Sequence, residues 1–264
     1  MNEPADTRPH ADDESRPKYA VPALEKALDV LEHLSEQAVP MTQAQLARAL
    51  RREPSELFRM LSCLESRGYL QRLANGGYTL SLKLFELSRT HSPHELLLQA
   101  AVPLMRDLVD RVRESCHLCV LHREQVLVLH QVDSPTPIRL SIEAGSLHPP
   151  VHTVSGQVLL AHLPEAERDD LLSRQPDFLR LTPTERQALR ERLARIAADG
   201  WAYTEGARFV GGLDLGVYVG SPRSRTRAVL TIAALKSRDG PDLFALLPRL
   251  RECAQAIAGT AGLL

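Results

Sequence analysis

Apolar residues recur at intervals of three and four along the first part of the chain, which is the pattern of amphipathic helices. One apolar stripe between Ala23 and Leu34 predicts a first helix. A second helix is expected after Thr42, which forms the sequence signature of a capping box with Gln45, three residues later. Pro54, a residue tolerated in a first helical turn, starts a third. Three helices are thus predicted in close succession.

The third of these helices, expected at 54–66, has two different faces. Its inward apolar positions are Leu57, Met60, Leu61 and Leu64, and its outward positions are Ser55, Glu56, Arg59 and Ser62. Gly68 ends the helix, and two alternating runs, 69–73 and 78–80, flank a glycine-rich turn at 75–77. Proteins that place a helix in the DNA major groove often have this order of elements: two short helices joined by a turn, followed by a two-stranded wing. The sequence therefore predicts a winged helix-turn-helix.

The remainder of the chain has a mixed pattern. Helical spacing predicts a short connecting helix and a longer one to about Val112, separated at Ser92-Pro93. Strands are expected at 116–122, 125–132, 138–143, 201–204, 214–219 and 228–234, and helices at 156–162, 165–173, 185–199 and from 242 onward. Strands with helices to one side indicate an antiparallel α+β sheet.

These patterns predict an α+β chain with several parts. Residues 1–19 are rich in Asp, Glu, Pro and Arg and are expected to form a disordered tail. Residues 20–85 are the predicted winged helix-turn-helix domain, residues 86–98 a linker helix, and residues 99–264 an effector-binding and oligomerisation domain. A length of 264 residues suits one small and one larger domain.

Charge is distributed in a way that fits a localised DNA contact. The formal net charge of -1 argues against a protein that coats nucleic acid through bulk electrostatics. Between residues 48 and 83, however, the sequence has seven basic residues and only three acidic ones. The basic set is Arg48, Arg51, Arg52, Arg59, Arg67, Arg72 and Lys83. This local excess has the sign required for phosphate.

Membrane and metal chemistry are not indicated. The chain has no apolar run of about 18 residues, and its first residues are polar and acidic, so a soluble cytoplasmic protein is expected. The cysteines, Cys63, Cys116, Cys119 and Cys253, are expected to be free thiols. Cys116 and Cys119 with His117 and His122 could bind a metal only on a turn, because residues three apart on a strand point to opposite faces. No metal and no cofactor are predicted.

Several segments together resemble the isocitrate-lyase-regulator (IclR) family of transcription factors. They are Ala23-Leu-Glu-Lys-Ala-Leu-Asp-Val-Leu-Glu, Gln45-Leu-Ala-Arg-Ala-Leu, Arg59-Met-Leu, Glu65-Ser-Arg-Gly-Tyr-Leu, Thr153-Val-Ser-Gly-Gln-Val-Leu-Leu-Ala, Gly200-Trp-Ala-Tyr and Gly211-Gly-Leu-Asp-Leu-Gly-Val-Tyr-Val. The chain departs from the family where Gln157 replaces a common lysine, Leu213 a common arginine and Glu56 a common threonine.

The resemblance implies a one-component regulator with a GAF-like second domain that binds a small organic acid. DNA contacts are expected from Thr42, Arg52, Ser55, Glu56, Leu57, Phe58, Arg59, Arg67 and Arg72. The resemblance implies effector contacts by Val154, Ser155, Thr204, Asp214, Thr231 and Ala233. Thr204 stands where Asp is common, and Thr231 and Ala233 where serines are common, so a larger or aromatic acid is expected. A sensor domain that changes half-site spacing requires two copies, so a dimer, or a dimer of dimers, is expected on the operator.

The start of the Ser155 helix is also a candidate anion site, because its backbone N–H groups and the helix dipole favour negative charge. Two alternatives remain for the second domain. One is a hydrolase-like enzyme that uses Ser155, His152 and Asp214 for acyl transfer, although the chain has no nucleophile-elbow or phosphate-loop motif. The other is an oligomerisation module without a ligand, in which the pocket residues only pack or cap helices.

Overall fold

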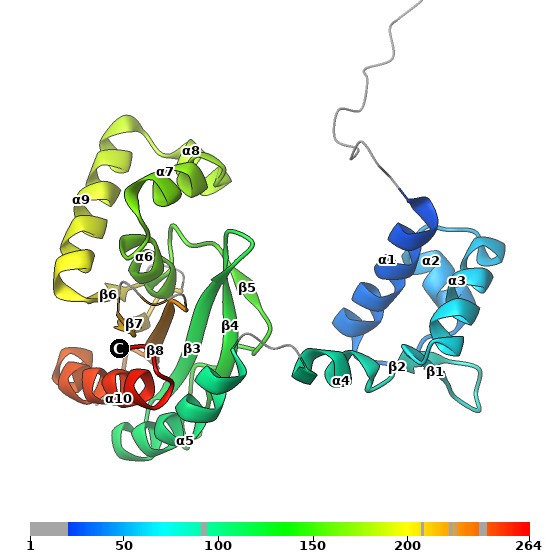
Figure 1. Ribbon diagram of the computed structural model, residues 1–264, viewed down its shortest axis with the longest axis horizontal. Coiled ribbons are helices and arrows are strands. Elements are labelled where there is room, and N and C mark those ends of the chain that lie inside the picture. Colours follow the sequence, from blue (N-terminus) through cyan, green and yellow to red (C-terminus); the bar gives the residue numbers. More distant parts are fainter. Residues whose placement is uncertain (1–20, 91–93, 207–208, 222–223, 225, 238–241) are drawn as a thin grey trace, which may run out of the picture. The chain divides into compact units, whose positions relative to one another are not determined.

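The computed structural model describes residues 21–90, 94–206, 209–221, 224, 226–237 and 242–264. The chain divides into two compact units, Met1–Ser92 and Pro93–Leu264 (Figure 1). The predicted tail at 1–19 and the predicted break at Ser92-Pro93 lie outside the described residues. Each unit has its own hydrophobic core.

The first unit confirms the predicted order of elements. Its helices and strands are α1 (Pro22–Gln37), α2 (Gln43–Ala49), α3 (Pro54–Ser66), β1 (Leu70–Arg72), β2 (Tyr78–Leu80) and α4 (Lys83–Thr90). β1 and β2 form an antiparallel pair, and an isolated bridge joins Met41 to Tyr78. These elements form a winged helix-turn-helix.

Local signals explain why these elements begin and end where they do. The Thr42 hydroxyl accepts a hydrogen bond from the Gln45 amide, and the Gln45 side chain accepts one from the Thr42 amide, which completes the capping box. The Gln43 side chain donates to the Pro54 carbonyl at 2.7 Å and so joins α2 to the start of α3. Gly68 follows α3 in the left-handed region, with a φ of 77°. The helix-turn-helix geometry is thus encoded locally.

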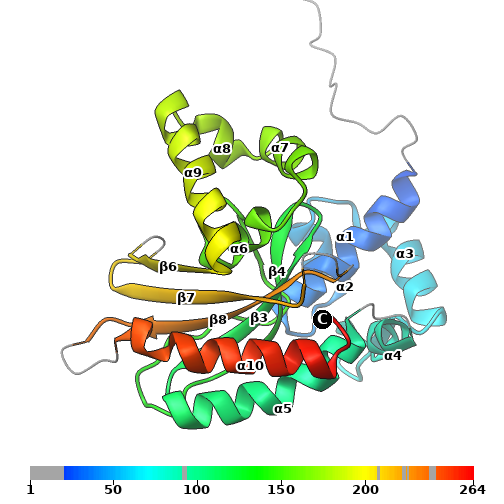
Figure 2. The ribbon, with the colours of Figure 1, turned by 60° about the vertical axis from the view of Figure 1, so that its left-hand side comes forward.

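The second unit is a six-stranded antiparallel sheet with helices on both faces (Figure 2). Its strands, in the order β5-β4-β3-β8-β7-β6, are β3 (Ser115–His122), β4 (Gln125–Val132), β5 (Leu147–His148), β6 (Trp201–Glu205), β7 (Gly212–Val219) and β8 (Ala228–Leu235). Its helices are α5 (Glu95–Val112), α6 (Val154–Ala161), α7 (Glu165–Ser173), α8 (Pro176–Arg180), α9 (Pro183–Asp199), the 3-10 helix η1 (Leu243–Leu246) and α10 (Leu247–Thr260).

Two apolar clusters fill the spaces on either side of this sheet. One lies between the sheet and α5 and α10, and includes Leu118, Leu215 and Leu230. The other lies between the opposite face and α6 to α9, and includes Cys119 and Val229. The expectation that helices lie to one side was therefore wrong, because both faces of the central strands carry apolar residues that must be covered.

Two further expectations differ from the structure. Residues 138–143 do not form a strand, although their polarity alternates, because the segment joins no ladder and Ile138 is 80% exposed. The short helix α8 was not predicted. By contrast, the hairpin between β3 and β4 turns at Arg123 and Glu124 as expected, and both residues have positive φ.

Cys116 and Cys119 both lie on β3, where their side chains join the clusters on opposite faces of the sheet. Both thiols are buried, and burial raises their pKa, that of Cys119 to about 12. The two sulfur atoms therefore lie on opposite faces of the sheet and cannot share a metal ion. Within the described ranges, no group of three or more His, Cys, Asp or Glu could hold a metal ion.

Candidate functional site

The outer side of α3 presents the residues expected to meet DNA. Ser55, Glu56, Phe58 and Arg59 are exposed, and Phe58 has 59% of its surface accessible. Leu57 is completely buried in the core of the first unit, together with Leu46 and Leu61. The prediction that Leu57 approaches DNA was therefore wrong, since its side chain is needed to hold α3 against α1 and α2.

Ion pairs from α1 reach two of the predicted DNA-binding residues. Lys26 Nζ lies 3.3 Å from Glu56 Oε2, and Asp29 Oδ2 lies 3.6 Å from Arg52 Nη2. Glu56 is therefore partly neutralised, and Arg52 already has an acidic neighbour. Within the described part of the chain, Arg59 and Arg67 have no acidic partner, so their charges are available to phosphate.

The wing carries Arg72 at the end of β1, with its guanidinium 5.6 Å from the centre of the Tyr78 ring. Gly76, with a φ of 80°, and the bond from the Gly77 amide to the Asn75 side chain shape the turn. Thr42 is half-buried and its hydroxyl is engaged in the cap of α2. A direct DNA contact by Thr42 remains a prediction.

The second unit contains a cavity of about 600 Å³ on the α6 side of the sheet. Apolar side chains form much of its wall, and they include Val126, Val128, Leu140, Ile142, Phe209 and Leu235. Its polar lining comes from His117, Ser141, Glu143, Ser146, His148, Thr153, Ser155, Asp214 and Thr231, together with Arg139. A mostly apolar cavity with a few converging polar groups is the usual form of a small-molecule site.

The N-terminus of α6 faces this cavity, because Thr153, Val154 and Ser155 all line it. Thr153 caps the helix by accepting from the Gly156 amide at 3.1 Å. For Val154 and Ser155, no acceptor of the backbone N–H group is found among the described residues. Two such amides at the positive end of a helix dipole favour an anionic ligand group.

Two glycines let α6 approach its surroundings. A Cβ on Gly156 would lie 2.3 Å from the Pro150 carbonyl oxygen, and a Cβ on Gly216 would lie 2.6 Å from Val154 Cγ1. Gly216 lies in β7 opposite Thr231 in β8. The absence of side chains at both positions therefore places the start of α6 close to the sheet.

Hydrogen bonds between buried polar side chains connect α6 to the sheet. Ser155 Oγ is 2.8 Å from Thr231 Oγ1 and 3.4 Å from His117 Nε2. Burial, with a smaller effect from His148, lowers the pKa of His117 to about 4. The imidazole is therefore neutral at pH 7 and contributes hydrogen-bonding capacity without charge.

Four of the predicted effector-binding residues, Val154, Ser155, Asp214 and Thr231, line the same cavity. Thr204 and Ala233 are the strand neighbours of Asp214, but they are not part of the lining. Several other residues that line the cavity were not predicted from the sequence, among them His117, Cys119, Arg139, Glu143 and His148. Most come from β3 and from the segment after β4, and only the alternation along β3 could have indicated that His117 and Cys119 share a face.

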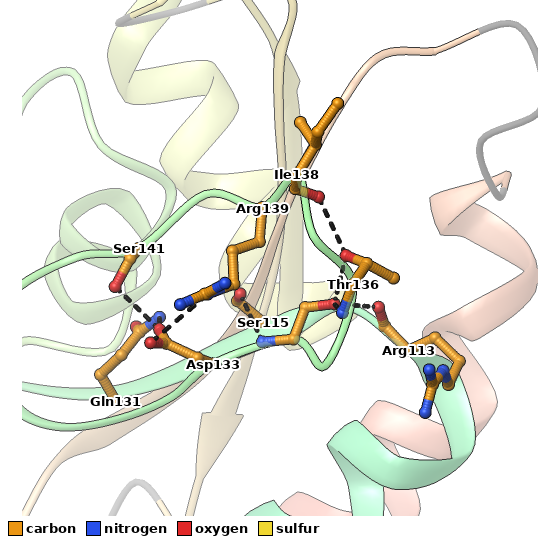
Figure 3. A network of polar contacts seen from close by, with 9 residues as sticks. Arg113, Ser115, Gln131, Asp133, Thr136, Ile138, Arg139 and Ser141 are labelled. Carbon is orange, nitrogen blue, oxygen red and sulfur yellow. Dashed lines mark hydrogen bonds and ion pairs between the residues drawn. The ribbon is translucent and has the colours of Figure 1, made fainter.

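Residues of the segment after β4 form a polar network beside the cavity (Figure 3). Asp133 Oδ1 accepts hydrogen bonds from Gln131 Nε2 at 3.0 Å and from Ser141 Oγ at 2.8 Å. Its other oxygen, Oδ2, lies 3.5 Å from Arg139 Nε. Arg139 and Ser141 both line the cavity, so Asp133 anchors one of its walls.

The proposed acyl-transfer triad is not assembled. His152 is exposed and does not line the cavity, and its Nε2 atom lies 3.9 Å from Asp177 Oδ2. The Ser155 hydroxyl is hydrogen-bonded to the Thr231 hydroxyl. Two of the three departures from the family pattern, Gln157 and Leu213, lie in the second unit and have structural roles there. Gln157 is buried and donates to the Val151 carbonyl at 2.9 Å, and Leu213 is buried in the core on the α5 and α10 side.

A winged helix-turn-helix joined to a cavity-bearing α+β unit defines the class of DNA-binding transcriptional regulators that carry a second, sensor-type domain. Family models agree with both parts. The IclR helix-turn-helix domain matches residues 23–74, and the bacterial transcriptional regulator IclR C-terminal domain matches residues 92–259. The chain therefore belongs to the IclR family of transcriptional regulators.

Individual relatives are similar over most of the chain. A probable transcriptional regulator SauR from Cupriavidus necator is 29% identical over 241 residues, covering 89% of this chain and 95% of that protein. A glycerol operon regulatory protein from Streptomyces griseus is 30% identical over 208 residues, covering 77% and 82% respectively. An IclR homologue from Microbacterium hydrocarbonoxydans, solved with 4-hydroxybenzoate, aligns with a TM-score of 0.78 at 25% identity, covering 91% of this chain and 99% of that one.

These relatives are named as regulators and not as enzymes. Among the helices that the structure describes, none has the length and apolar character needed to cross a bilayer.

Proposed function

We propose that this regulator binds a double-stranded operator in the cytoplasm as a homodimer, and that a small aromatic acid bound in the second unit changes its operator affinity. The observation that carries the proposal is the cavity of about 600 Å³ into which α6 directs its N-terminus. Residues 86–98 would link the two functions.

The DNA-binding part of the proposal rests on α3 and the wing. Ser55, Phe58 and Arg59 are exposed on one helix, and the exposed side chains of Arg67 and Arg72 would contact phosphate. Direct contacts to base edges would come from α3, and Glu56 could accept a hydrogen bond from cytosine N4 once released by Lys26. Arg52 would contribute a phosphate contact.

The effector part rests on the chemistry of the cavity wall. A carboxylate suits the free amides of Val154 and Ser155, and an aromatic ring suits the valine, leucine and isoleucine side chains that line the cavity. Asp214 would accept a hydrogen bond from a ligand hydroxyl, and Thr231 would complete the polar end. The 4-hydroxybenzoate in the Microbacterium homologue is a ligand of this class.

A homodimer is supported by apolar side chains that the first unit leaves exposed. Leu24 and Leu28 on α1 are 56% and 45% exposed, and Leu84 and Leu87 on α4 are 41% and 45% exposed. Exposed apolar residues at helical spacing are typical of a surface that a second copy covers. Dimers would also match a palindromic operator, and two of them could pair into a tetramer.

We infer that the second unit binds its ligand without converting it. The only histidine within reach of Ser155 among the described residues is His117, at 3.4 Å, and Thr231 already holds the serine hydroxyl. A nucleophile needs a closely placed base, so Ser155 is poorly suited to acyl transfer. Incubation with 4-hydroxybenzoate or a simple ester should return the compound unchanged.

The proposal is tested with the full chain. Selection from random duplexes should enrich one palindromic sequence, and light scattering should show a dimer or tetramer on it. A thermal-shift screen of organic acids should then find compounds that stabilise the protein and change its operator affinity. Enrichment of no sequence would contradict the DNA role, and a cavity that accepts no acid would contradict the effector role.

A further inference from the structure

The described residues that line the cavity of the second unit include one strong cation and two acidic side chains. Among the described residues that line it, Arg139 is the only Arg or Lys, whereas Glu143 and Asp214 are both carboxylates. An organic acid that enters this space brings a further negative charge. Because a partly buried anion needs a counter-charge, and a helix N-terminus supplies only about half a unit, the amides of α6 alone do not balance the site.

We propose that Arg139 is the counter-ion of the bound effector, and that Asp133 holds Arg139 in the ligand-free protein and competes with the effector for it. This inference rests on the proposed effector function of the cavity, and it adds the residue that selects acids over neutral compounds of the same shape.

The pairing between Arg139 and Asp133 is suited to such an exchange. The Nε to Oδ2 distance is 3.5 Å, and the two side chains are 42% and 43% exposed. Ion pairs of this kind contribute little to stability, so transferring Arg139 to another anion costs little. A ligand carboxylate in the less hydrated cavity would form the stronger, charge-assisted bond.

Asp133 would not be left without partners by this exchange. Its Oδ1 atom accepts from both Gln131 and Ser141, while Arg139 approaches only Oδ2. The hydrogen bonds from Gln131 and Ser141, followed by the charge of Arg139, hold the pKa of Asp133 below its usual range. The carboxylate thus remains ionised and stabilised when Arg139 moves to the ligand.

The base of this segment is firmly attached, which gives Arg139 a defined position (Figure 3). The Ser134 amide donates to Ser115 Oγ at 2.9 Å, and the Ser134 hydroxyl donates to the Arg113 carbonyl. Thr136 bonds to Ser134 through its amide and to the Ile138 carbonyl through its hydroxyl. Arg139 follows directly after this anchored turn, so an ordered backbone presents it to the cavity.

The two members of the pair can be separated by conservative substitutions. Arg139→Gln removes the cation. Asp133→Asn keeps the Oδ1 acceptor for Gln131 and Ser141 and replaces only the oxygen that Arg139 approaches. Arg190 and Asp169, paired at 3.4 Å with 47% and 42% exposure, are the matched control because neither lines the cavity.

Calorimetric titrations of the full-length wild type and variants would use benzoate, 4-hydroxybenzoate and the neutral analogue 4-hydroxybenzamide. We expect Arg139→Gln to weaken carboxylate binding about tenfold or more and to leave binding of the amide unchanged. Asp133→Asn should strengthen carboxylate binding by up to about fivefold, because the competitor is removed. The double variant should behave like Arg139→Gln, and Arg190→Gln and Asp169→Asn should behave like the wild type.

The outcomes separate this inference from the proposed function. If the wild type binds none of these acids, nor any acid of a wider aliphatic and aromatic panel, the effector function fails and the role of Arg139 fails with it. If the wild type binds an acid and Arg139→Gln binds it equally well, only the inference is overturned. The inference is also overturned if both variants weaken binding together, since the pair would then merely support the cavity wall.

Discussion

Glu56 of α3 and Lys26 of α1 form an ion pair, with 3.3 Å between Oε2 and Nζ. Glu56 stands in the outward face of the predicted recognition helix, where a carboxylate would repel phosphate. Lys26 therefore reduces the repulsion that Glu56 would otherwise exert.

Lys26→Ala is accordingly expected to weaken operator binding by a few-fold, since it exposes the full charge of Glu56. Lys26→Ala combined with Glu56→Thr should restore affinity. Fluorescence anisotropy with a selected operator at two salt concentrations measures the operator affinity of both variants. If the double variant binds as weakly as Lys26→Ala alone, Lys26 contacts DNA itself and does not act through Glu56.

Arg59→Ala should reduce operator affinity by about 1–3 kcal/mol and relax the preference for one base pair, because Arg59 is exposed on α3 without an acidic partner among the described residues. Arg67→Ala, as a phosphate contact, should weaken specific and nonspecific duplexes alike. Competition binding against single-base operator variants distinguishes the base contact of Arg59 from the phosphate contact of Arg67. Equal affinity of Arg59→Ala and the wild type would remove Arg59 from the interface.

The sequence predicted the first unit nearly completely because its signals are local. The capping box at Thr42 and the αL glycine Gly68 each involve residues a few positions apart. The helical pattern placed Leu57 correctly on the inward face, and only its additional assignment as a DNA contact was wrong, because the side chain is completely buried.

The cavity was only partly predictable. The start of α6 could be found from its cap at Thr153, but the contact of Ser155 with His117 depends on long-range pairing that places His117 opposite Thr231. The segment around Arg139 alternates like a strand, yet it is held by Asp133 and by the anchored turn before it. Hydrogen bonds of that kind are not visible in a polarity pattern.

Asp214→Ala should abolish or strongly weaken effector binding while operator affinity without ligand persists, because Asp214 lines the cavity and lies in the other unit. Thr204→Val is the matched control, since Thr204 faces Asp214 across β6 and β7 without lining the cavity. Calorimetry with the best acid from a thermal-shift screen measures both. Unchanged ligand affinity in Asp214→Ala would contradict its assignment as an effector contact.

Gly156→Ala should destabilise the second unit by about 2–3 kcal/mol or more, because the added Cβ would lie 2.3 Å from a backbone carbonyl that cannot easily move. Gly259→Ala in α10 is the control, as its Cβ would meet only Leu264 Cδ1 at 3.6 Å. That variant should be neutral or up to about 1 kcal/mol more stable, since alanine favours a helix. Urea unfolding followed by fluorescence of Trp201, the single tryptophan, compares them. Equal stability of the two variants would refute the close approach of α6 to Pro150.

His117 should make the second unit less stable in acid. Burial lowers its folded-state pKa from 6.5 to about 4, so between these pH values the unfolded chain binds a proton that the folded protein does not. Stability is therefore lost as pH falls through this window, by up to about 3 kcal/mol for this group alone. His117→Gln removes the titration and keeps a polar side chain near Ser155. The difference in unfolding free energy between wild type and variant should thus change from pH 7 to pH 4, with the wild type losing more. If the unfolding free energies of wild type and variant change equally with pH, or if NMR gives His117 a pKa near 6.5, the imidazole is not buried as the structure places it.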